Sequence, residues 1–308
     1  MKENQASFTA MSVAYMRALH AMYDAPKIFD DFLAYDLIPE EKRVLIEQHI
    51  IEQYVTWDQQ LNDPENVATL YDRITTSESL MQAINNVISR ARYTEDTLEK
   101  AFRQGVKQYV ILGAGMDTFA FRRPEMLEEL EVFEVDHPAT QEFKIQRLAD
   151  LGWKHPAKLH FIPIDFTKES LVTALIRSSS SYDPKIKSFF SWFGVTPYLT
   201  KEDVVTTLRS IAEVAPSGSI LVFDYIDTDA FIPEKLSPQM RELIGYLEKI
   251  GEPIQSGCFN SLNLAEDLAN LGFQLDEDLS PKEIEGRYLL GRKYGHYDHG
   301  HFACAVVD

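Results

Sequence analysis

The amino-acid sequence predicts an α/β fold with a mainly parallel sheet, helices on both faces of that sheet and a helical cap at the N-terminus. Two observations lead to this prediction. Residues 8–100 show helical periodicity throughout, whereas from residue 109 short apolar runs alternate with helical stretches. Strands that alternate with helices form mainly parallel sheets with right-handed crossovers. We therefore expect a cap over residues 1–104 and a sheet core over residues 105–308, which together form one compact unit.

The cap is predicted to consist of amphipathic helices. Apolar residues recur at helical spacing over Phe8–Tyr23, and Pro26 ends that pattern. Glu40–Trp57 and Ser77–Ala91 have the same periodicity. Thr94 indicates the start of a separate helix over Thr94–Gln104, because threonine is a common residue at helix starts. The chain then enters the first strand of the core.

Short apolar runs predict seven strands in the core, and we expect these strands to form one sheet. The last run follows closely on the segment RYLLGRKYG, so we expect an antiparallel strand at the end of the chain. The candidate strands are Gln108–Leu112, Glu131–Val135, Lys158–Ile164, Ile186–Trp192, Ser219–Tyr225, Phe273–Asp276 and His301–Val307. The helices between them are Ala139–Leu151, Ser170–Ile176, Lys201–Val214, Pro238–Ile250 and Ser261–Leu271.

Composition excludes several classes of partner. A formal net charge of -18 disfavours nucleic acid, whose binding depends on clustered Lys and Arg. Apolar runs such as Ser219–Phe223 and Ala303–Val307 are too short to cross a bilayer, and the N-terminal segment lacks the apolar stretch of a signal peptide. Cys258 and Cys304 do not make a disulfide framework. We expect a cytoplasmic protein that binds neither nucleic acid nor membranes.

Residues 109–138 carry the most informative motif. The apolar run Tyr109–Leu112 ends in the turn Gly113-Ala114-Gly115, and glycines there let the backbone turn sharply and approach a ligand. An acidic residue at the tip of the next strand, Glu134 or Asp136, is placed to accept hydrogen bonds from ribose hydroxyls. The motif therefore indicates a nucleoside pocket at the carboxyl ends of a parallel sheet.

Two residues after this turn favour S-adenosylmethionine over a dinucleotide. The dinucleotide fingerprint has a third glycine three residues after the second, where this chain has Thr118, preceded by Asp117. A carboxylate at the start of a helix repels a pyrophosphate, but it does not repel a sulfonium cofactor without phosphates. NAD remains the alternative cofactor, and a strand-to-helix turn without any ligand is a further alternative.

An ordered set of motifs resembles the class I S-adenosylmethionine-dependent methyltransferases of the leucine carboxyl methyltransferase type, in their bacterial O-methyltransferase branch. The motifs lie in family order and span almost the whole chain. They are S-x-T-A at 7–10, R-A-R-Y at 90–93, V-I-L-G-A-G-M-D-T at 110–118, F-E-V-D-H-P at 133–138, I-D-F at 164–166, S-W-F-G-V-T-P-Y-L at 191–199, L-V-F-D-Y at 221–225 and R-Y-L-L-G-R at 287–292. This resemblance implies a Rossmann-like sheet.

The resemblance also implies how the cofactor is held. Gly113 and Gly115 line its methionine part, and Asp136 rather than Glu134 holds the ribose hydroxyls. Arg92, or its neighbour Arg90, pairs with the cofactor carboxylate, because a guanidinium fork matches a carboxylate.

Four further residues complete the implied cofactor site. Asp165 accepts the adenine amino group and Phe166 packs beside the ring. Related sequences often carry Glu where this chain has Phe193, so no carboxylate role transfers to that position. Trp192 and Phe193 are instead expected to form an apolar or cation–π wall near the sulfonium.

The implied activity is transfer of a methyl group to an oxygen, carboxylate or hydroxyl, of a small molecule or a carboxyl terminus. No catalytic base is assigned; Tyr225, at the end of a strand, and Arg287, a possible clamp for a carboxylate acceptor, are the catalytic candidates. The loose spacing of His296, His299 and His301 disfavours a metal site. An NAD-dependent oxidoreductase, or a cofactor-binding protein without turnover, is the alternative function. Tyr294 and Tyr297 are candidates for an aromatic lid.

Overall fold

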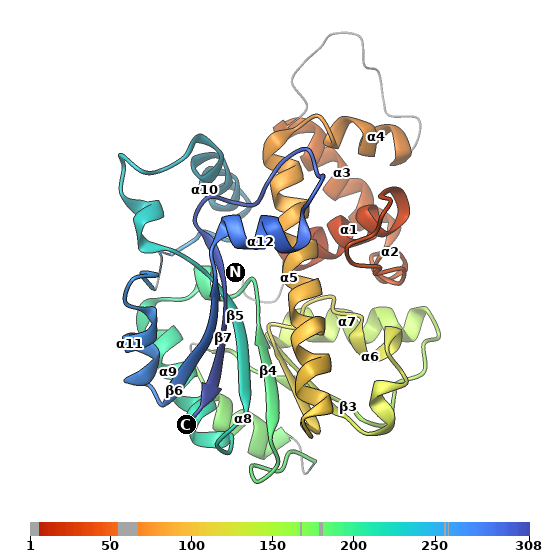
Figure 1. The fold of residues 1–308 in the computed structure, drawn as a ribbon. Helices are drawn as coiled ribbons and strands as arrows, with labels where there is room; N and C mark the ends of the chain where they lie inside the picture. Colours follow the sequence, from red (N-terminus) through yellow and green to blue (C-terminus); the bar gives the residue numbers. More distant parts are fainter. Residues whose placement is uncertain (1–5, 55–66, 167, 179–180, 256, 258) are drawn as a thin grey trace.

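The computed structural model describes residues 6–54, 67–166, 168–178, 181–255, 257 and 259–308. A seven-stranded sheet in the order β3-β2-β1-β4-β5-β7-β6 forms the core (Figure 1). The first five strands in this order pair in parallel, and β7 is antiparallel to both of its neighbours. The predicted fold class and the antiparallel last strand are confirmed. The strands are β1 (Gln108–Leu112), β2 (Glu131–Asp136), β3 (Leu159–Pro163), β4 (Ser188–Trp192), β5 (Ile220–Ile226), β6 (Phe273–Leu279) and β7 (Gly300–Val307).

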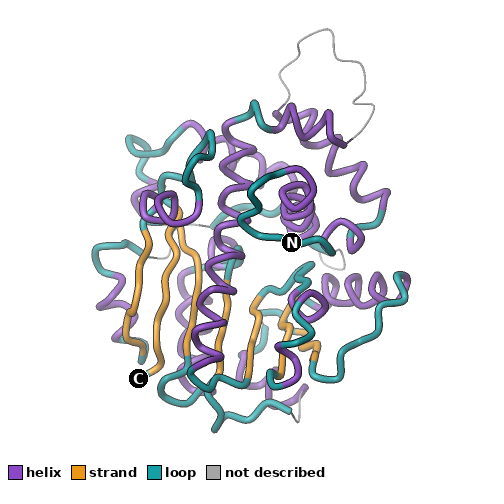
Figure 2. Tube along the Cα trace, turned by 45° about the vertical axis from the view of Figure 1, so that its right-hand side comes forward, coloured by secondary structure: helices purple, strands orange, loops and turns teal. Residues whose placement is uncertain are grey.

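Helices cover both faces of the sheet and form the cap. The cap helices are α1 (Phe8–Tyr23), α2 (Ala34–Leu37), α3 (Glu40–Tyr54) and α4 (Val67–Ile74), and α5 (Glu78–Arg103) extends from the cap along the sheet (Figures 1 and 2). The other helices are α6 (Phe119–Arg122), α7 (Pro138–Asp150), α8 (Leu171–Ser178), α9 (Lys201–Val214), α10 (Pro238–Ile250), α11 (Leu264–Ala269) and α12 (Pro281–Tyr288), with 3-10 turns at Met126–Glu128, Thr196–Tyr198 and Thr228–Phe231.

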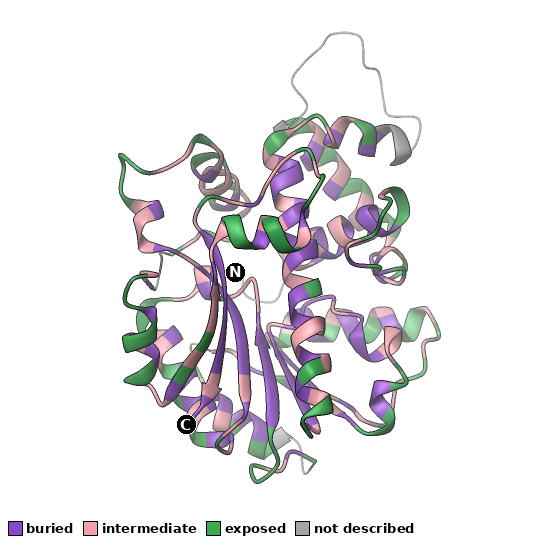
Figure 3. Ribbon diagram, in the orientation of Figure 1, coloured by how far each residue is buried: buried purple, intermediate pink, exposed green. Residues whose placement is uncertain are grey.

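The central strands are buried on both faces (Figure 3). On one face Val110, Phe190 and Phe223 pack with residues of α8, α9 and α11. On the other face Tyr109 and Phe189 pack with residues of α5, α6 and α12. Burial on both sides explains why these strands are continuous apolar runs in the sequence. A third apolar cluster holds α1 to α5 together in the cap.

The cap differs from the sequence prediction at α5, which is one helix from Glu78 to Arg103 rather than two. Thr94 lies inside it, and its hydroxyl donates to the carbonyl of Arg90, 2.8 Å away. A threonine that bonds the carbonyl four residues earlier is compatible with a helix interior, so Thr94 is not a helix start. The helices α2 and α4 lie in the stretch predicted as helical but were not predicted as separate helices, and α6 and α12 were not predicted. Trp57 lies outside the described residues.

No helix in the described part of the chain combines the length and the apolar composition needed to cross a bilayer.

Candidate functional site

A cavity of about 790 Å³ lies at the carboxyl ends of the parallel strands, between the sheet and the cap. Its walls come mainly from the loops after β1 to β4, from the end of β5 and from α1, α3, α5 and α10. In open α/β sheets this edge is where ligands bind, and the volume suits a cofactor together with a second small molecule.

The glycine turn after β1 forms part of the cavity wall. Gly113 and Gly115 have φ angles of +74° and +51°, in the left-handed region that favours glycine. A Cβ on Gly113 would lie 2.1 Å from Cγ2 of Val195, which follows β4, and one on Gly115 would lie 3.1 Å from Cβ of Ala10 in α1. Both glycines therefore let the turn pack tightly beneath its neighbours while its backbone faces the cavity.

Asp136, at the end of β2, lines the cavity beside this turn. Its carboxylate accepts hydrogen bonds from the backbone N–H of Gly115 and from that of His137, the latter at 2.5 Å. Burial raises the pKa of Asp136, and the two N–H donors oppose that rise by stabilising the anion. The carboxylate is thus held in a fixed orientation against the glycine turn.

Glu134, the other acidic candidate, does not line the cavity. Its side chain is buried and pairs with the ammonium of Lys144 in α7, which is buried as well. Burial raises the pKa of Glu134 to about 7. Residues two apart on a strand point to the same side, but only the last one reaches past the end of the strand, which explains why Asp136 alone faces the cavity.

The end of β3 contributes a second acidic residue. Asp165 and Phe166 follow β3 and both line the cavity, with Ile164 beside them. The Asp165 carboxylate lies 2.9 Å from the ammonium of Lys168. The structure therefore brings together the predicted residues from the ends of β1, β2 and β3.

Of the two arginines in the R-A-R-Y motif, Arg90 lines the cavity and Arg92 does not. Positions two apart on a helix lie about 200° apart, so both cannot face the same space. Arg92 is half exposed and pairs with Asp96 at 2.5 Å. The Arg90 guanidinium lies 3.4 Å from the carboxylate of Asp224 at the end of β5. Of the two arginines named for the cofactor carboxylate, Arg90 therefore faces the cavity and Arg92 faces away from it.

A glycine makes room for the Arg90 guanidinium. Gly194 has a φ of +68°, and a Cβ there would lie 2.8 Å from Nη1 of Arg90. The Gly194 N–H donates to the Asp224 carboxylate at 2.8 Å. Burial raises the pKa of Asp224, and Arg90 opposes this rise. Asp224 and Gly194 together position Arg90, a role that the sequence analysis missed.

Phe193 and Trp192 point in opposite directions. Phe193 lines the cavity and packs edge-on against Tyr93 and Phe302. Trp192 is fully buried in the apolar core on the other face of the sheet and does not line the cavity. Alternate residues of a strand face opposite sides of a sheet, so the two rings cannot form one wall. Trp192 was expected in that wall, but it does not line the cavity.

The two catalytic candidates are both engaged elsewhere. Tyr225 touches the cavity, but its hydroxyl donates to the carboxylate of Asp278 in β6 at 2.9 Å, and burial raises its pKa. Arg287 lies on α12, does not line the cavity and makes two hydrogen bonds to Glu277, at 2.7 and 3.1 Å. Arg287, expected as a clamp for a carboxylate acceptor, therefore lies outside the cavity wall.

The histidines and tyrosines near the C-terminus do not form a common site. Among the described residues, no three His, Cys, Asp or Glu side chains are grouped so that they could hold a metal ion. Tyr297 lines the cavity, whereas Tyr294 does not and its hydroxyl donates to the carbonyl of Thr76 at 3.3 Å. Of these two tyrosines, Tyr297 is the one that lies at the cavity.

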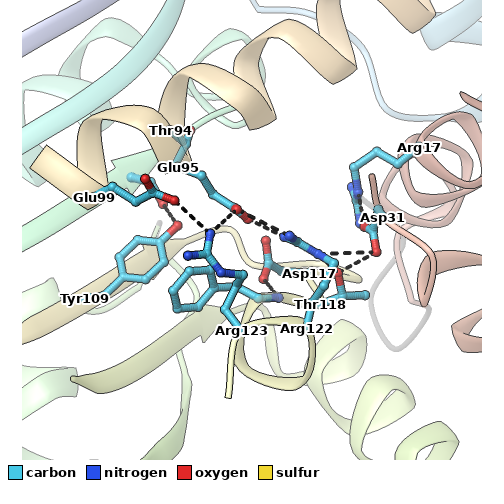
Figure 4. Close-up of polar contacts among 12 residues, drawn as sticks. Arg17, Asp31, Thr94, Glu95, Glu99, Tyr109, Asp117, Thr118, Arg122 and Arg123 are labelled. Carbon is cyan, nitrogen blue, oxygen red and sulfur yellow. Dashed lines mark hydrogen bonds and ion pairs between the residues drawn. The ribbon is translucent and has the colours of Figure 1, made fainter. Parts of the chain in front are cut away.

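A chain of ion pairs fastens the cap to the glycine turn (Figure 4). Arg17 in α1 pairs with Asp31 at 2.7 Å, and the Thr118 hydroxyl donates to the same carboxylate at 2.7 Å. Asp117 accepts from the backbone N–H of Phe119, the first residue of the short α6, at 2.7 Å. The chain continues through four further residues, Arg122, Glu95, Arg123 and Glu99.

Away from the sheet, the wall of the cavity becomes mainly apolar. There its walls are mainly apolar side chains of four helices, and we call this part the apolar chamber. It is formed by Val13 and Met16 of α1, Ile46 and Ile50 of α3, Leu80, Ala83 and Val87 of α5, and Met240, Leu243 and Leu247 of α10.

Glu252, just after α10, holds the start of α1 over the cavity. Its carboxylate accepts from the backbone N–H of Phe8 at 3.1 Å and from that of Thr9 at 3.3 Å. The Ser7 hydroxyl donates to it as well, at 3.3 Å. A carboxylate at a helix N-terminus satisfies free N–H groups and suits the helix dipole. The cap is thus tied to the segment that closes the apolar chamber.

Several known proteins are similar to this chain in sequence. A family model described as leucine carboxyl methyltransferase matches residues 10–212. YktD of Bacillus subtilis (strain 168), provisionally named an S-adenosyl-L-methionine-dependent methyltransferase, is 37% identical over 305 residues, which cover 95% of this chain and 94% of that protein. A protein of Mycolicibacterium smegmatis with a similar provisional name is 31% identical over 218 residues, or 71% of this chain and 66% of that protein.

Solved structures share the fold at low sequence identity. A provisionally described methyltransferase from Thermobifida fusca has a TM-score of 0.57 and 11% identity, covering 100% of this chain and 97% of that one. A DUF574 family protein from Streptomyces avermitilis has a TM-score of 0.55 and 15% identity, covering 85% and 97%. Identities this low support the fold alone.

Proposed function

This chain belongs to the leucine carboxyl methyltransferase family, and on that premise we propose that it transfers a methyl group to an oxygen, carboxylate or hydroxyl, of a small molecule or a carboxyl terminus. It is an S-adenosylmethionine-dependent methyltransferase. The observation that carries the proposal is the carboxylate of Asp136, fixed by two backbone N–H groups against the glycine turn at the cavity wall.

The residues at the sheet edge fit S-adenosylmethionine. Asp136 would accept hydrogen bonds from the ribose hydroxyls, and Asp165 one from the adenine amino group, with Phe166 beside the ring. Arg90 would pair with the methionine carboxylate, and Gly113 and Gly115 would line the methionine chain. The two glycines support this fit, because side chains there would collide with Val195 or crowd Ala10.

Asp117 and Thr118 weigh against NAD as the alternative cofactor. Asp117 lines the cavity at the start of α6, where a pyrophosphate would meet its negative charge. Thr118 occupies the position of the third glycine, and its hydroxyl is bound to Asp31. Both features support a cofactor without phosphates.

The protein's task is to align the two reactants and exclude water. S-adenosylmethionine supplies a methyl group on a cationic sulfur; its transfer forms a carbon–oxygen bond, breaks the carbon–sulfur bond and leaves a neutral thioether. Phe193 offers an aromatic ring to that cationic region. The apolar chamber would hold the acceptor in line, and such alignment can supply much of the rate enhancement. A carboxylate acceptor needs no base, whereas the proton of a hydroxyl acceptor must pass to water or a base.

A cytoplasmic location and the absence of a nucleic-acid partner belong to the same proposal. Cys304 is buried and free of disulfide bonding, and Cys258 lies outside the described residues. The net charge of -18 opposes binding to a phosphate backbone.

Isothermal titration with S-adenosylhomocysteine and, separately, with NADH tests the cofactor. We expect binding of S-adenosylhomocysteine alone; binding of NADH alone would overturn the proposal. A methyl-transfer assay with labelled S-adenosylmethionine against paired carboxylic acids and phenols then tests turnover. Cofactor binding without transfer to any member of the panel would favour a binding protein without turnover.

A further inference from the structure

Asn86 is a polar residue in the wall of the apolar chamber. It lies one helical turn before Arg90 on α5, so both side chains face the cavity. Ala83 and Val87 flank it on the same wall. The side chain therefore stands on the acceptor side of the residue proposed to hold the cofactor carboxylate.

The hydrogen bonds of His296 fix the orientation of the Asn86 carboxamide. Nδ1 of His296 lies 3.2 Å from the carbonyl oxygen of Tyr297, and a carbonyl can only accept, so Nδ1 carries the hydrogen. Burial lowers the pKa of His296 to about 4, which keeps the ring neutral at neutral pH and leaves a lone pair on Nε2. Nδ2 of Asn86 donates to Nε2 at 2.9 Å. The carboxamide nitrogen of Asn86 is therefore occupied by His296. A flipped carboxamide would instead place Oδ1 against the lone pair on Nε2, which is unfavourable.

The surroundings of His296 hold the ring in place. Its backbone N–H donates to the carboxylate of Glu285 at 2.8 Å. The ring packs edge-on against Phe302, with centroids 5.3 Å apart. Gly300 leaves space for it, since a Cβ there would lie 2.8 Å from Cε1 of His296. The orientation of Asn86 is therefore built into the structure, and none of the described residues donates a hydrogen bond to its Oδ1.

The charges around the cavity disfavour a second anion beside the cofactor carboxylate, which is already assigned to Arg90. Four cationic side chains of the described residues line it, and each lies within ion-pair distance of a carboxylate: Arg17 with Asp31, Arg90 with Asp224, Arg122 with Glu95, and Lys168 with Asp165. A carboxylate beside Asn86 would meet the partial negative charge of Oδ1. A hydroxyl or N–H group there would find an acceptor.

We infer that Asn86 selects the methyl acceptor, its Oδ1 accepting a hydrogen bond from a hydroxyl or N–H group of an uncharged, largely apolar molecule in the apolar chamber. The inference rests on the proposed function and narrows its acceptor class. Asn86 binds the acceptor and does not take up its proton.

Three matched probes test the inference by titration into protein saturated with S-adenosylhomocysteine: 2-naphthol, 2-methoxynaphthalene, which lacks the donor, and 2-naphthoate, which is charged. We expect 2-naphthol to bind about tenfold more tightly than either, the value of one hydrogen bond of about 1.4 kcal/mol. The preference should disappear in Asn86→Leu, which is similar in size to asparagine and has no acceptor oxygen. Gln82→Leu is the control, because Gln82 lies one turn away on α5 and does not line the cavity.

Several outcomes would overturn the inference: no binding of 2-naphthol, binding of 2-naphthoate as tight as that of 2-naphthol, or an unchanged preference in a folded Asn86→Leu variant. Each leaves the proposed function standing if S-adenosylhomocysteine still binds. Failure of the wild-type protein to bind S-adenosylhomocysteine is a failure of the proposed function itself.

Discussion

The two sides of the cavity are built in different ways. The sheet side takes its acidic residues from the ends of parallel strands, with Asp136 at the end of β2, Asp165 after β3 and Asp224 in β5. The apolar chamber takes its walls from four helices that lie far apart in the sequence. Strand order places the first group, whereas helix packing places the second. A shared fold can therefore keep one cofactor site while the acceptor site varies.

The two sides of the cavity also differ in whether their buried polar residues are charged. On the sheet side, buried carboxylates are stabilised by backbone N–H groups and arginine, as at Asp136 and Asp224. In the chamber, the polar residue Asn86 is neutral and is oriented by a neutral histidine, His296. Variants on the sheet side should therefore change charge balance and cofactor affinity, and variants of the chamber should change acceptor choice.

The largest effect is expected from the buried pair behind the sheet side. Lys144→Met would leave Glu134 buried without its cation, and breaking such a pair costs about 3–5 kcal/mol. Urea denaturation measures the loss in the free energy of unfolding. Replacing both residues, as Glu134→Leu with Lys144→Met, should recover part of it. A Lys144→Met variant as stable as wild type would show that the pair is unimportant.

On the chamber side, burial of His296 should make the stability of the folded protein depend on pH. Its pKa is about 4 in the folded protein against 6.5 ordinarily, because the ring is buried. Between pH 6.5 and 4 the unfolded chain binds a proton that the folded protein does not, so stability falls as the pH falls, by up to about 3 kcal/mol. Denaturation of wild type and His296→Gln across this range should show their stability difference shrinking. A constant difference would contradict a neutral, buried His296.

A smaller effect is expected from Gly194→Ala, which would push a methyl group against the Arg90 guanidinium. We expect affinity for S-adenosylhomocysteine to fall by about 1–2 kcal/mol, since Arg90 would lose its alignment with the cofactor carboxylate. Gly152→Ala is the matched control: Gly152 has a similar φ of +67° and nothing within 4 Å of an added Cβ. Equal losses of affinity in both variants would show that contact with Arg90 is not the cause of the loss.

The smallest effects are expected from Arg92→Ala and Arg287→Ala. Both side chains are partly exposed and paired with neighbouring carboxylates away from the cavity. Exposed pairs contribute about 0–1 kcal/mol, so stability and cofactor affinity should change little. Loss of methyl transfer in Arg287→Ala, with stability intact, would restore this arginine as a catalytic candidate.

The sheet and its cofactor edge could be predicted from the sequence because the determinants are local. The buried strand β1 is a continuous apolar run, and the turn at Gly113 and Gly115 requires left-handed φ angles. The helix α12 also had a readable signal that was missed, since Ser280 and Glu283 form a capping box around Pro281.

The remaining features depend on orientation or on contacts between distant segments. Strand alternation could have separated Trp192 from Phe193, but the choice between Arg90 and Arg92 required the register of α5 against the sheet. The pairing of Asn86 with His296 joins residues 210 positions apart, which no local pattern indicates. The acceptor side of the cavity could therefore not be predicted from the sequence alone.

Affinity for S-adenosylhomocysteine in two variants tests the division of the cavity most directly. Asp136→Ala, on the sheet side, should weaken binding about 5- to 150-fold, the effect of losing about 1–3 kcal/mol from a buried polar contact. Ala83→Phe, which fills the apolar chamber, should leave this affinity within about twofold of wild type and abolish methyl transfer, because only the acceptor is displaced. Unchanged affinity in a folded Asp136→Ala variant, or an equal loss in Ala83→Phe, would contradict the division.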